Sequence, residues 1–143
     1  MRAVKPFLSQ DSLRMVYYSY IHSIMTSGLI FCGNTHYSNT IFRLQKRIIR
    51  IIVEIRGTDS CREHFKKLKI LPLQSQYILS LLLFVINKRD YFKVNSELHN
   101  INTRTKSNLH RPIPNLSVYP KGTYYFGIKV FNSLPSQKKG LVP

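Results

Sequence analysis

Apolar side chains recur every three or four residues over residues 12–28, a spacing that predicts an amphipathic helix. Asp11 or Ser12 could cap its first turn, because a short side-chain oxygen accepts an orphan amide proton there. Gly28 is a natural end, and the following LIFCGN is either extended or a continuation of the helix. The apolar stripe consists of Leu13, Val16, Tyr17, Tyr20, Ile21 and Ile24.

A second amphipathic helix is predicted over residues 41–55, with Ser38 or Asn39 as its cap and Gly57 as its end. Four cations of RLQKRIIRII fall on one side of it. Like charges at this spacing repel by roughly 0.3 kcal/mol per pair, so such a helix tolerates or suits an anionic neighbour. The apolar stripe consists of Ile41, Leu44, Ile48, Ile51, Ile52 and Ile55, and the cationic stripe of Arg43, Lys46, Arg47 and Arg50.

Two further helices follow. Asp59 or Ser60 could cap a short helix over residues 61–69, and Glu63 stands three residues after Ser60 in capping-box position. Residues 73–88 are hydrophobic nearly all round, so we expect this helix at the centre of the bundle, packed against the apolar face of 41–55.

The composition changes after Asp90, where Asn, Ser, Thr, Pro and His become frequent. Apolar residues return to helical spacing near Tyr124, and Pro135 ends that helix. The sequence therefore predicts a mainly α protein, a small helical bundle with an irregular, partly extended C-terminal third. The expected segments are a lead-in (1–10), the bundle (11–92), an irregular connection (93–120), and a C-terminal helix and tail (121–143).

The charge is strongly one-sided, with 22 Lys and Arg against 6 Asp and Glu, a net charge of +16. This balance favours a polyanionic partner, either nucleic acid or an anionic membrane surface. The other interpretation is that the charge served contacts inside a larger parent protein. The residues expected to contact phosphates are Arg43, Lys46, Arg47 and Arg50, with an adjacent patch of Lys66, Lys67 and Lys69.

Tyrosines could add stacking surfaces for unpaired bases. The competing interpretation is that they are core aromatics. The residues concerned are Tyr17, Tyr18, Tyr124 and Tyr125.

Catalytic motifs are absent from the sequence. The six acids (Asp11, Glu54, Asp59, Glu63, Asp90 and Glu97) form no paired-carboxylate site of the kind that two-metal chemistry requires. Cys61 and His64 lie one helical turn apart, and Cys32 with His36 could complete a metal site, but the spacing matches no zinc motif. We expect no enzyme activity, no cofactor and no metal.

A membrane location is not expected. The longest apolar run, Tyr77 to Ile86, is about half of what a bilayer crossing needs, and the N-terminus lacks a signal peptide. Helix 41–55 could lie on a membrane surface, although its apolar face is more simply used inside the protein. We expect an intracellular protein of the cytoplasm or nucleus, with reduced cysteines.

Three blocks of sequence, in order, resemble the segment that follows the reverse transcriptase core in jockey-like non-LTR retrotransposons. They begin LRMVYYSYIHSIMTSGLIFCGN, DSCREHFKKLKILPLQ and KGTYYFGIKVFNSLP, and the last carries an Asn-x-Leu-Pro signature. Ser27 and Cys32 stand where the family favours Tyr and Trp, and two lost aromatics should cost packing.

The resemblance implies a truncated, thumb-side piece of an RNA-directed DNA polymerase whose catalytic aspartates lie upstream. The leading hypothesis is therefore a non-catalytic fragment that binds RNA or DNA, with the rest of the polymerase as a further partner. The alternative is an inactive structural or protein-interaction remnant without nucleic-acid binding.

Overall fold

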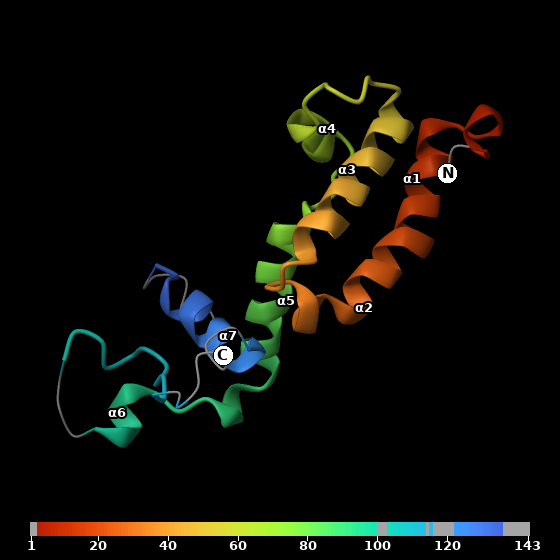
Figure 1. Ribbon diagram of the computed structural model, residues 1–143. Helices are drawn as coiled ribbons and strands as arrows, with labels where there is room; N and C mark the ends of the chain where they lie inside the picture. Colours follow the sequence, from red (N-terminus) through yellow and green to blue (C-terminus); the bar gives the residue numbers. More distant parts are fainter. Residues whose placement is uncertain (1–2, 100–102, 114, 116–121, 136–143) are drawn as a thin grey trace. The chain divides into compact units, whose positions relative to one another are not determined.

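The computed structural model describes residues 3–99, 103–113, 115 and 122–135, and these are mainly helical, which confirms the predicted fold class (Figure 1). The chain forms two compact units, residues 1–77 and 78–143, and their boundary falls inside α5 (Leu73–Asn87). The predicted boundary at residue 92 thus lies within the second unit. Parts of the predicted lead-in, connection and tail (1–2, 100–102, 114, 116–120, 121 and 136–143) lie outside the described residues.

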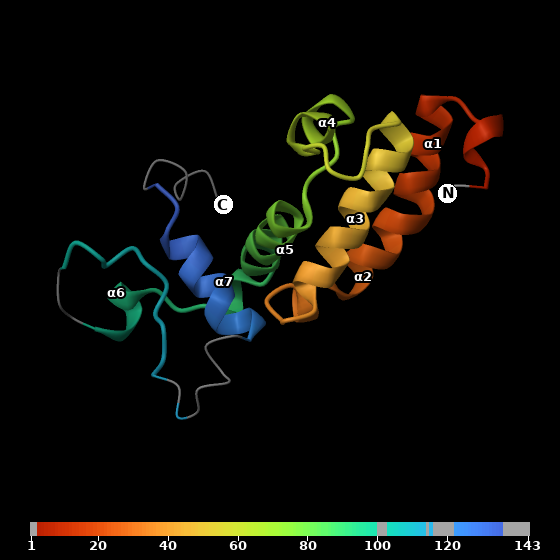
Figure 2. The same cartoon turned by 45° about the horizontal axis from the view of Figure 1, so that its top comes forward.

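The first unit is built on a helical hairpin. One continuous helical run descends, the chain turns, and α3 returns beside it, with the short α4 near the end of α3 (Figures 1 and 2). The elements are η1 (Lys5–Phe7), α1 (Gln10–Val16), η2 (Tyr17–His22), α2 (Ser23–Cys32), α3 (Ser38–Val53) and α4 (Arg62–Lys67).

The first helical run is longer than predicted at both ends. It begins at Gln10, because Ser9 and not Asp11 or Ser12 supplies the cap, its Oγ accepting a bond from the Ser12 amide at 3.2 Å. It passes through Gly28 and ends at Cys32, so LIFC continues the helix and Gly33 follows it. The middle stretch, η2, is π-helical, a local widening often found at functional sites.

The predicted ends of two other helices also need correction. α3 stops at Val53, before Gly57, because Glu54 adopts a left-handed conformation with φ of 60°. α4 begins at Arg62 without the expected capping box, and Ser60 Oγ accepts a bond from the Arg62 amide at 3.4 Å instead.

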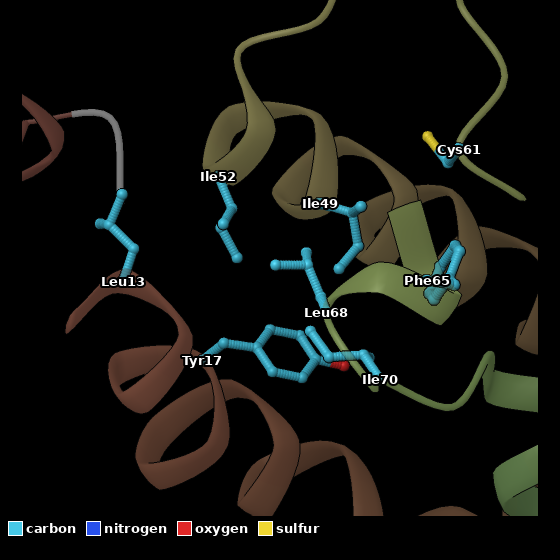
Figure 3. Packing of buried hydrophobic residues seen from close by; sticks show 8 residues of the cluster. All are labelled: Leu13, Tyr17, Ile49, Ile52, Cys61, Phe65, Leu68 and Ile70. Carbon is cyan, nitrogen blue, oxygen red and sulfur yellow. The ribbon is translucent and has the colours of Figure 1, made fainter. Parts of the chain in front are cut away.

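The core of the first unit lies between the hairpin and the α4 region (Figure 3). Ile49 and Ile52 of α3 are buried there, whereas Leu44 of the predicted stripe is 53% exposed. The buried face of α3 is therefore rotated from the prediction. It packs against α1 and the α4 region, and Gln45 on this face bonds to Leu73 in the first turn of the predicted helix 73–88. The cluster consists of Leu13, Tyr17, Ile49, Ile52, Cys61, Phe65, Leu68 and Ile70.

Gln45 is a buried polar residue at the centre of this buried face, 1% exposed. Its Nε2 donates to the Tyr17 hydroxyl at 2.9 Å and to the Leu71 carbonyl at 3.0 Å. Its Oε1 accepts a bond from the Leu73 amide at 2.9 Å. One side chain thus joins η2, α3 and the first turn of α5, with all three partners satisfied.

The second unit contains most of α5, with η3 (Arg89–Tyr91), α6 (Asn95–Leu98) and α7 (Thr123–Asn132). Within α5 the burial is one-sided, because Leu81 and Val85 are buried while Ile78 and Leu83 are 44% and 48% exposed. The prediction of a helix buried on all sides is therefore wrong. The core of this unit consists of Val85, Phe92, Leu109, Ile128 and Phe131.

In the described part of the irregular connection, Val94 and Leu109 form an antiparallel bridge, a short extended pairing. The Asn132 side chain holds Leu109 from another direction. Its Oδ1 accepts a bond from the Leu109 amide and its Nδ2 donates to the Leu109 carbonyl, both at 2.9 Å. This is a structural role for the asparagine of the Asn-x-Leu-Pro stretch.

Candidate nucleic-acid interface

Arg43 and Arg47 are the most available cations of α3. Both side chains are exposed, and their i, i+4 spacing places them about 6 Å apart along the helix axis. Over the described ranges, ion pairing is limited to Lys5 and Glu54, whose Nζ and Oε1 lie 3.0 Å apart. The two arginines therefore face solvent without an acidic partner.

Lys46 and Arg50, the other two predicted contact residues on α3, already have contacts within the protein. The Lys46 ammonium lies 4.5 Å from the centre of the Phe42 ring, a cation–π contact. Arg50 donates two hydrogen bonds to the Asp59 carbonyl, from Nη2 at 2.9 Å and from Nε at 3.3 Å. Arg50 thus holds the turn after α3, while the Lys46 ammonium lies on a ring of its own helix, so both charges are less free to meet a phosphate.

The predicted lysine patch is exposed on and just after α4. Lys66 and Lys67 occupy the solvent side of α4, while Phe65 and Leu68 point into the core. The backbone of Lys69 is fixed, with φ of 56° and its carbonyl accepting a bond from the Tyr18 hydroxyl at 2.7 Å. The structure thus keeps all three lysine side chains at the surface.

A recess of about 550 Å³ lies at the C-terminal end of α3. It brings Lys5 together with Arg47 and Arg50, opposed by the single carboxylate of Glu54. Sequence reasoning missed Lys5, because only the pairing of the chain's beginning with the end of α3 places it there. The apolar part of the lining comes from Ile51 and Ile55.

The tyrosines divide between core and surface. Tyr17 is fully buried, and burial raises the pKa of its hydroxyl above the ordinary value of 10.0. Tyr124 stacks on Phe92 with ring centres 5.0 Å apart, and Tyr125 packs edge-on against Tyr124. Tyr17 and Tyr124 therefore belong to the core clusters, Tyr125 packs on Tyr124, and Tyr18, 37% exposed, donates its hydroxyl proton to the Lys69 carbonyl.

The described residues provide neither a metal site nor a membrane-spanning helix. No three His, Cys, Asp or Glu side chains come together there in a way that could hold a metal ion. Nor does any helix in these ranges combine the length and the apolar character required to cross a membrane. Cys32 and Cys61 are both free thiols.

Comparison with known proteins yields no relative: no family model, curated protein or solved structure matches this chain.

Proposed function

We propose that this protein binds RNA or DNA through the exposed cations of α3 and the α4 region, and that it catalyses no reaction itself. The observation that carries the proposal is a set of exposed cations that have no acidic partner among the residues the structure describes: Arg43, Arg47, Lys66, Lys67 and Lys69. Such residues contact phosphates and position a strand without reading its sequence.

The number of exposed cations sets the expected salt dependence. If all five cations contact phosphates, the logarithm of the association constant should fall linearly with the logarithm of the salt concentration. The expected slope is about −3.5 on single-stranded nucleic acid and about −4.5 on duplex DNA. Replacing two of them should reduce the single-strand slope by about 1.4.

The resemblance to the segment after the reverse transcriptase core of jockey-like elements supports RNA as the first ligand to test. On this proposal the chain derives from an RNA-directed DNA polymerase, and the remaining polymerase is a second partner. It would act inside the cell, where both thiols stay reduced.

The test is a titration of labelled 20-nucleotide single-stranded RNA with the full chain at several salt concentrations. The double variant Arg43→Gln/Arg47→Gln should weaken binding and flatten the slope. The control variant Lys93→Gln/Arg104→Gln removes the same charge from exposed positions of the second unit. It should change the affinity and the salt slope much less. Equal losses in the two variants would show that only net charge matters and would overturn the proposed interface.

One observation favours the alternative of a structural or protein-interaction fragment. The charges of Lys46 and Arg50 are used in contacts within the protein, as expected of a basic helix whose side chains stabilise the fold and bind no nucleic acid. The same titration decides, because a folded protein that leaves RNA free at low salt would support this alternative.

A further inference from the structure

An apolar groove of about 320 Å³ lies between the first helical run and α3, entirely within the first unit. Its surfaces are unusually exposed for large apolar side chains: Tyr20 is 67%, Ile24 60% and Leu44 53% exposed. The groove is separate from the cationic patch on α4. Its principal lining residues are Tyr20, Ile24, Gly28, Ile41, Leu44 and Ile48.

Gly28 lines the groove and leaves room for a side chain. A Cβ built at this position would meet only the Cys32 sulfur, at 3.9 Å, which is ordinary van der Waals distance. Because Gly28 is a lining residue, a larger side chain at this position should occupy part of the groove.

The groove is bordered by positive charge on one side. Arg47 is three residues after Leu44, which lines the groove, so the two are neighbours on the surface of α3. Arg43 precedes it by one turn, and neither arginine has an acidic partner in the described residues. Along residues 15–32, the opposite wall, there is no Lys or Arg.

We propose that this groove binds an amphipathic helix of another protein that carries acidic residues along the flank lying over α3. Grooves between two helices receive such helices by taking apolar side chains at i, i+3, i+4 and i+7. The lining residues of the first wall run from Tyr20 to Cys32, about 18 Å of helix, which corresponds to a bound segment of about twelve residues.

Two other occupants fit the observations less well. A second copy of this chain, with net charge +16, would bring one arginine border against another. A lipid surface suits a convex apolar face, whereas this apolar surface is concave.

The probes are two synthetic helical peptides with the same leucine stripe, one flanked by Glu and one by Lys, measured by fluorescence anisotropy with the full chain. We expect the Glu peptide to bind at least about tenfold tighter than the Lys peptide. Gly28→Leu should fill the groove and weaken binding of the Glu peptide about tenfold or more. Leu44→Ser, at a half-exposed position, provides a second variant with the same expected loss.

The control is Phe31→Ser, which changes an exposed apolar side chain of α2 that does not line the groove, and it should leave peptide binding unchanged. Circular dichroism checks that each variant folds. RNA binding by Gly28→Leu should stay unchanged, so failure here is distinguishable from failure of the proposed nucleic-acid interface.

Three results would overturn the inference. The first is equal affinity for both peptides, and the second is full binding by folded Gly28→Leu. The third is no binding of the Glu peptide while the protein self-associates or sediments with anionic phosphatidylglycerol vesicles in a Gly28-dependent way.

Discussion

Replacing Gln45 by Leu should destabilise the first unit more than any surface change on α3. The substitution keeps a similar volume but removes both donors and the acceptor. The Tyr17 hydroxyl, the Leu71 carbonyl and the Leu73 amide then lose their bonds of 2.9, 3.0 and 2.9 Å. The bonds to Tyr17 and Leu73 are buried, so water does not replace the Gln45 amide there, whereas the bond to the Leu71 carbonyl is only part-buried and Leu71 is 45% exposed.

The size of the effect follows from these three contacts. The two buried groups, the Tyr17 hydroxyl and the Leu73 amide, cost about 1–3 kcal/mol each when left without a partner, and the gain from burying an apolar Leu offsets about 1–2 kcal/mol of the sum. Central values of about 4 and about 1.5 kcal/mol leave an expected net loss of about 2–3 kcal/mol. This is a large fraction of the roughly 5–15 kcal/mol that stabilises a typical domain.

Thermal and urea unfolding followed by circular dichroism at 222 nm measure this loss, since the chain has no tryptophan. Gln74→Leu is the matched control, because Gln74 is exposed on α5 and should change stability little. Combining Gln45→Leu with Tyr17→Phe should cost less than the sum of the two single changes, because they share a hydrogen bond. If Gln45→Leu unfolds at the same urea concentration as Gln74→Leu, the inferred network contributes nothing and the reasoning is refuted.

Three further outcomes are expected, each measured by the same unfolding assay. Gly33→Ala should destabilise by about 2 kcal/mol, because its Cβ would collide with the Tyr77 ring, whereas Gly57→Ala meets no atom within 4 Å and should be nearly neutral. Glu54→Gly should stabilise by about 0.5–1 kcal/mol, because it relieves a φ of 60° and loses only an exposed ion pair; a loss of stability would contradict the strain. Tyr17 binds its proton more tightly when folded, since its pKa is raised, so the free energy of unfolding should fall as pH rises above about 10, where the unfolded chain ionises first. The free energy of unfolding of the Tyr17→Phe variant should fall less steeply over that pH range. A slope equal to that of the unmodified protein would exclude Tyr17 as the cause.

The helical segments were largely predictable from the sequence, because their apolar periodicity is strong. The orientation of α3 was not, since apolar residues cover more than half of its circumference and several faces could be buried. The contacts with α1 and the α4 region select the face through Ile49 and Ile52. Gln45 precedes Ile49 and Ile52 at i, i+4 and i+7, and this spacing was the available signal for its burial.

The sequence predicted which cations could form the candidate interface. It did not predict which of them are free and which have contacts within the protein. Arg50 and Arg47 are equivalent by composition, but only Arg50 lies within reach of the Asp59 carbonyl once the chain turns back at Glu54. The place of Lys5 beside that turn likewise depends on tertiary contacts. Local sequence patterns carry no information about such pairings.

The Asn132 side chain has a consequence for the order in which the protein forms during synthesis. The first unit has all its core residues by Tyr77, so it can complete its hairpin while the rest of the chain is still being made. In the second unit, the amide and carbonyl of Leu109 receive their asparagine partner 23 positions later. We therefore expect a nascent chain with a finished first unit to carry an unfinished second one until α7 leaves the ribosome, a stage at which Val85 and Phe92 remain open to chaperones.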